Sequence, residues 1–163
     1  MLNWVDFAIV GLFAAALILE VKRGFGRAVF DFAALLAAVK FTPTLADRLS
    51  HALQFTAKLS TNEAAIYLVL FFIIGGALVF LGKLVYDTTL ISAETFDALL
   101  GGMFGIGIAI ILCHAFVRTI ALSAGSLSIP PAVIIQSAFG TEFLNFESYH
   151  RLLEVLYNFH RVD

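Results

Sequence analysis

Four long apolar runs follow one another along the chain, each bounded by charged residues or by residues that commonly cap helices. A hydrocarbon core of about 30 Å takes about 20 helical residues to cross, so runs of this length predict membrane-spanning helices. We therefore expect an all-α membrane protein with about four transmembrane helices, near residues 4–20, 28–42, 63–82 and 97–118. The second run is short and is interrupted by Asp31, so it is expected to need neighbouring helices.

The end of the chain differs in kind from these runs. Residues 1–122 are predicted to form the four-helix transmembrane domain, and residues 123–163 a separate segment. Pro130 and Pro131 cannot continue a helix, so this segment is expected to start irregularly. From near Asn145 the pattern predicts an amphipathic C-terminal helix, which would lie in the membrane interface or dock on a partner.

Local signals predict where the helices begin and end. Pro43 is expected to stop the second helix, and residues 45–53 then form a short amphipathic segment on the surface. Asn62 is expected to cap the third helix and Ser92 the fourth, because such side chains accept hydrogen bonds from the first free N–H groups.

Composition excludes several classes of function. The chain is 61% hydrophobic and 13% charged, so lipid is the expected solvent for its surface. A net charge of −2 offers no basic surface for nucleic acid. Cys113, the single cysteine, can form no intrachain disulfide. The sequence contains no recognisable nucleotide, metal or cofactor motif and no catalytic triad, so we expect no enzyme.

The charges beside the runs bear on membrane orientation. Lys22 and Arg23 with Arg27 in the first loop predict that this loop is cytoplasmic, which puts both termini outside. Lys40, Arg48 and Lys58 near the second loop favour the opposite orientation.

Three ionisable residues at membrane depth need partners, because each costs about 2.5–3.5 kcal/mol to insert. These are Asp6, Asp31 and His114. Arg27 stands one turn before Asp31 and is expected to pair with it. Arg118, one turn after His114, places that residue near the headgroups. A proton relay through Asp31 and His114 is the functional alternative.

The fourth run contains a pair of glycines, Gly101 and Gly105, with helical GxxxG spacing. Small residues at this spacing let another helix backbone approach closely. We expect these glycines to pack against a neighbouring helix; the alternative is a pore-lining or substrate-lining role.

Three short motifs carry a family resemblance. They read W-V-D-F-A-I at residues 4–9, R-G-F-G-R at residues 23–27, and F-D-A-L-L-G-G-M-F-G, which includes Asp97, at residues 96–105. In the order of these three motifs, and in their position relative to the four predicted spans, the chain resembles the colicin V production (CvpA) family of bacterial inner-membrane proteins.

The sequence also departs from the pattern of that family. Ala28 stands where the family usually has Glu, Ala98 where it usually has Arg, and a further Arg of the glycine-rich helix is missing near Gly107. A mechanism that rests on an intramembrane Arg–Glu pair is therefore in doubt here, although Asp31 is placed to substitute for the acid.

The resemblance implies a multi-pass inner-membrane protein that supports colicin V production or export and envelope maintenance. Our leading hypothesis is an accessory or scaffold that forms homo-oligomers or binds another membrane protein. The alternative is a small oligomeric channel or transporter, which Asp31 and the glycine-interrupted helix favour.

Overall fold

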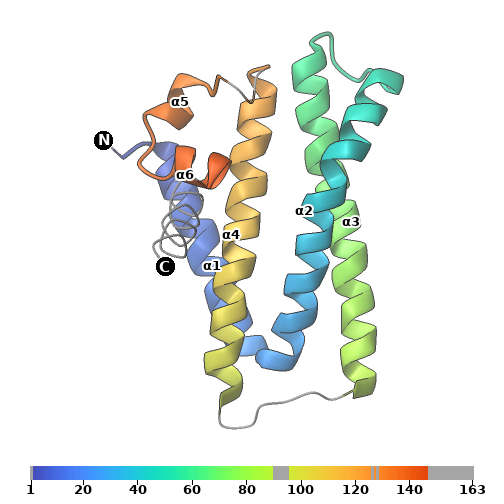
Figure 1. Ribbon diagram of the computed structural model, residues 1–163, viewed down its shortest axis with the longest axis vertical. Coiled ribbons are helices and arrows are strands. Elements are labelled where there is room, and N and C mark those ends of the chain that lie inside the picture. The colour runs from blue at the N-terminus through green and yellow to red at the C-terminus, as the bar shows by residue number, and fades with distance from the viewer. Residues whose placement is uncertain (1, 90–95, 126, 128, 147–163) are drawn as a thin grey trace, which may run out of the picture.

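The computed structural model describes residues 2–89, 96–125, 127 and 129–146 (Figure 1). Every regular element in these ranges is a helix, and four helices are long and apolar enough to cross a membrane. The predicted all-α membrane fold is confirmed. The six helices are α1 (Trp4–Arg23), α2 (Phe25–Ala52), α3 (Leu59–Thr89), α4 (Asp97–Ser123), α5 (Ala132–Ile135) and α6 (Gly140–Asn145).

Helix α4 lies at the centre of the bundle. It packs against α1 on one side and against the paired helices α2 and α3 on the other (Figure 1). The short helices α5 and α6 lie beside the start of α1, and α6 contacts α4. The segment that follows the fourth span is therefore folded back onto the bundle as far as Phe146. The amphipathic helix predicted from near Asn145 falls mostly outside the described residues, as does the cap predicted at Ser92.

Helix α2 continues through Pro43, so the prediction that it stops there was wrong. Pro43 has no N–H to donate to the carbonyl of Val39, four residues earlier. Next to it, the Oγ1 of Thr42 donates to the carbonyl of Ala38 at 2.7 Å. Beyond the proline, Ala46 is buried in the same core as residues of α3 and α4. Packing on two neighbours thus extends the helix through residues that were expected to form a separate surface segment.

The turn between α2 and α3 is held by a buried amide. Asn62 is not the N-cap of α3, because that helix begins earlier, at Leu59. Its side chain instead accepts from the N–H of Phe55 at 2.9 Å and donates to the carbonyls of Ser50 and Leu53, at 3.0 and 2.6 Å. One side chain therefore satisfies three backbone groups that lipid could not hydrogen-bond.

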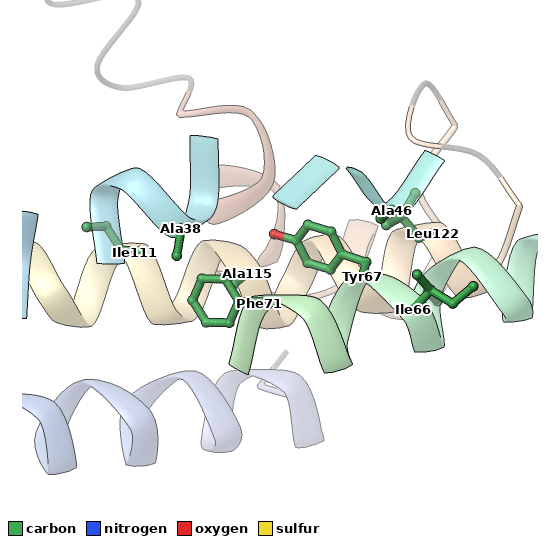
Figure 2. Close-up of a cluster of buried hydrophobic side chains, with 9 residues drawn as sticks. Ala38, Ala46, Ile66, Tyr67, Phe71, Ile111, Ala115 and Leu122 are labelled. Carbon is green, nitrogen blue, oxygen red and sulfur yellow. The ribbon is translucent and has the colours of Figure 1, made fainter. Parts of the chain in front are cut away.

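The largest core cluster joins α2, α3 and α4 (Figure 2). Tyr67 and Phe71 project from α3, with their ring centroids 6.4 Å apart and nearly parallel. The helices facing them contribute small residues, including Ala38 from α2 and Ala115 from α4. This pairing of large with small side chains allows the three helices to pack closely around the two rings.

The contact between α1 and α4 depends on glycine. A Cβ at Gly101 would lie 2.7 Å from the carbonyl oxygen of Glu20 and 3.0 Å from the carbonyl carbon of Gly24. At Gly105 it would lie 3.0 Å from the Cβ of Glu20 and 3.4 Å from the Cα of Leu17. The glycine face of α4 is thus occupied by α1 of the same chain.

This packing predicts opposite effects for two glycine substitutions. Gly101→Ala should lower stability by about 1–3 kcal/mol, because the added methyl group meets backbone that can move only with the helix. Gly76→Ala on α3 is the matched control, since its Cβ would meet no atom within 4 Å. It should be neutral or stabilising by up to about 1 kcal/mol through helix propensity. Thermal unfolding in one detergent measures both; equal midpoints would contradict the packing described.

Candidate functional site

The turn between α1 and α2 consists of one residue, Gly24, with a φ of +83°. Its N–H donates to the carbonyl of Glu20 at 3.0 Å and closes α1. The carboxylate of Asp97, at the start of α4, accepts from the N–H of Phe25 at 3.1 Å and so caps α2. A Cβ on Gly24 would lie 1.8 Å from the other oxygen of Asp97. Both the backbone angle and the carboxylate therefore require glycine here.

A cluster of ion pairs lies at the same end of the bundle. The Nη1 of Arg23 is 2.9 Å from the Oε1 of Glu20 and 3.0 Å from the Oδ2 of Asp31. The Nε of Arg27 is 3.5 Å from that same oxygen of Asp31. The two acidic side chains are only 4% and 3% exposed, while those of Arg23 and Arg27 are 39% and 22% exposed. The carboxylates thus lie inside and the guanidinium groups reach outward.

The tertiary fold brings together most of the polar residues that the sequence singled out. The expected pair between Arg27 and Asp31 is present, but Arg23 approaches Asp31 more closely. Glu20 was overlooked as a site residue, although its spacing of three residues from Arg23 on one helix was a usable signal. We call Glu20, Arg23, Arg27 and Asp31, together with Asp97, the turn cluster.

Asp6 lies at the opposite end of α1 and has a different set of partners. It is 1% exposed and accepts from the backbone N–H of Asn3 at 2.8 Å and of Phe139 at 3.1 Å. The hydroxyl of Ser137 donates to it as well. The carboxylate therefore caps α1 and anchors the segment that carries α5 and α6, a structural task that its burial explains.

His114 is likewise remote from the turn cluster. Its Nδ1 lies 2.7 Å from the carbonyl oxygen of Phe143, and its ring stacks on Phe146 with centroids 4.9 Å apart. Along α4 it stands 17 residues from Asp97, about 25 Å at the helical rise. Asp31, Asp97 and His114 therefore do not surround one polar cavity, and the relay through Asp31 and His114 gains no support.

Arg118 of α4 packs against an aromatic ring. The guanidinium of Arg118 lies over the ring of Tyr67, 5.7 Å from its centroid. No group of three His, Cys, Asp or Glu side chains suited to a metal ion occurs among the described residues. Among the described residues, the turn cluster is thus the place where buried charged side chains gather.

The ion pairs of the turn cluster predict that Arg23 contributes more to the stability of the fold than Lys22 does. Arg23→Met removes the one group that contacts both buried carboxylates and should cost about 1–3 kcal/mol, less than for a fully buried pair because Arg23 is partly exposed. Lys22→Met, on the exposed side of the same turn of α1, is the control and should change stability by less than about 0.5 kcal/mol. Thermal unfolding in detergent compares the two, and similar losses would refute the assignment.

Comparison with known proteins now gives the chain its family. A family model described as Colicin V production protein matches residues 5–146. No curated protein and no solved structure matches the sequence. The matched region includes α1 to α4, the turn cluster and the segment anchored by Asp6, and it covers most of the chain. The protein is a membrane protein that belongs to the colicin V production family.

Proposed function

We propose that the protein is an accessory or scaffold of the bacterial inner membrane that binds another membrane protein and thereby supports colicin V production or export and envelope maintenance. The observation that carries this proposal is a groove of about 350 Å³ along α1, one of the four helices that are long and apolar enough to cross a membrane. It is lined by Ile9, Val10, Phe13, Ala14 and Leu17 of α1 and by Phe139 and Phe143 of the anchored segment.

The position of α1 supports a partner helix as the occupant of this groove. Helix α1 packs mainly on α4, so much of its surface faces away from the bundle. Val10 is 54% exposed, and Ala14 lies one turn further along the groove. A small residue between larger apolar ones is the arrangement that lets a second membrane helix approach closely. The glycine face of α4 cannot serve this purpose, because α1 already covers it.

The interior of the bundle favours an accessory role over conduction by one copy. The buried clusters between the helices consist of apolar side chains, and Tyr67, with the aromatic and aliphatic residues around it, fills the space between α2, α3 and α4. A water-filled path would need polar groups along its length. The alternative of an oligomeric channel or transporter rests on the buried carboxylates of Glu20 and Asp31.

Photocrosslinking in native membranes tests the groove. A photoreactive residue at Val10 should crosslink to one defined membrane protein, whereas one at Ile73, a similarly exposed position on α3, should not. Ala14→Phe should reduce the yield of that crosslink about tenfold, and the amount of colicin V that the cells release should fall by a similar factor. The reason is that a bulky ring in a packed contact weakens binding of the partner helix by about 1–3 kcal/mol. Ala15→Phe, the next residue around α1, is the matched control.

Two results would decide against this function. Crosslinking of Val10 to lipid alone, with Ala14→Phe as active as Ala15→Phe, would mean that no partner uses the groove. Crosslinking only to a second copy, together with ion or solute flux in vesicles that contain the purified protein, would instead establish the oligomeric channel.

A further inference from the structure

A second groove lies between α2 and α4 and has a volume of about 390 Å³. We call it the α2–α4 groove, and it shares no lining residue with the groove along α1. No carboxylate is among the described residues that line it, and its walls are apolar except for one imidazole. A hydrocarbon chain therefore suits these walls. The lining includes Leu36 and Val39 of α2, Gly107, Ile111 and His114 of α4, and Phe146.

Arg118 lies on the face of α4 that lines this groove. It stands one turn after His114 and three turns after Gly107, so the three residues share one side of the helix. Along the axis it is about 6 Å beyond His114 at the helical rise. Arg118 is also the last residue of the fourth predicted span, where the headgroup layer begins. The groove thus leads from hydrocarbon depth towards a cation at headgroup level.

The charge of Arg118 has no counter-charge among the described residues. Its guanidinium lies over the ring of Tyr67, but it takes part in none of the ion pairs found there. Its Nε has no hydrogen-bond partner in the same part of the chain. The side chain is only half-buried, so a ligand from outside the chain can reach it. A guanidinium presents its N–H donors in a planar fork that matches a phosphate group.

We propose that the α2–α4 groove and Arg118 together bind one phospholipid, with an acyl chain in the groove and the phosphate on the guanidinium. The phosphate supplies the counter-charge that Arg118 lacks, through charge-assisted hydrogen bonds. The apolar walls add contacts that a free anion cannot make, so the site selects a lipid over inorganic phosphate. This site does not depend on the partner proposed for the groove along α1.

Native mass spectrometry of the full-length protein in a neutral detergent tests the site with three probes. These are dioleoyl phosphatidylglycerol, dioleoylglycerol, which lacks the phosphate, and inorganic phosphate. The phospholipid should bind as one defined adduct. Dioleoylglycerol should bind about tenfold more weakly, because it cannot accept the charge-assisted hydrogen bonds of Arg118. Inorganic phosphate at the same concentration should not bind, because it makes no contact with the groove.

Two pairs of variants separate the phosphate contact from the acyl-chain contact. Arg118→Gln should weaken binding of the phospholipid about tenfold and leave that of dioleoylglycerol unchanged. Arg48→Gln, an exposed arginine of α2, is its control and should bind the phospholipid as the wild type does. Leu36→Trp should weaken binding of both lipids, because the larger ring takes up space in the groove. Leu81→Trp, at a similarly exposed position on α3, is the control for this change.

Other outcomes would overturn the proposal. Equal binding of dioleoylglycerol and the phospholipid would mean that no phosphate contacts the protein. Binding of inorganic phosphate as tight as that of the phospholipid would mean a site for a free anion. Phospholipid binding that Arg118→Gln lowers no more than Arg48→Gln would mean that a carboxylate of this chain already neutralises Arg118. The comparison of the three probes on the wild type decides the first two points, even if a variant fails to fold.

Discussion

The structure depends on the close approach of α4 to the end of α1, where the backbone at Gly101 faces the carbonyl of Glu20. No side chain fits between the two helices at this point. The approach brings Asp97 to the first free N–H of α2, so one helix caps another across the bundle. A one-residue turn at Gly24 is possible because this carboxylate replaces the cap that a longer loop would supply.

The same approach encloses charged groups that lipid alone would not tolerate. Glu20 ends up beneath α4, and the reversal at Gly24 returns Asp31 to its side. Arg23 then joins the two carboxylates while its own side chain still reaches the surface. In a medium without water the cost of burying each charge is offset only by such partners, so the ion pairs and the glycine contact form one structural unit.

Buried polar side chains also fix the other end of the bundle, but there they bind backbone. Asp6 accepts from the N–H groups of Asn3 and Phe139, and Asn62 satisfies three backbone groups of the turn between α2 and α3. The middle of the bundle is held by apolar contacts around Tyr67. Hydrogen bonds and ion pairs thus hold the two ends of the bundle together, and the close fit of apolar side chains holds its centre. The groove along α1 exists because Asp6 holds Phe139 beside that helix.

The sequence by itself determined the four spans, their order and the pairing of Arg27 with Asp31, because hydrophobic runs and helical spacing are local properties. It did not determine that α2 passes Pro43, that Asn62 lies inside α3, or that Glu20 belongs with Asp31. Each of these depends on which helix lies alongside. Phe25 and Asp97 are 72 residues apart in the sequence, so no local pattern links them. Only the packing of α4 on the turn at Gly24 makes them neighbours.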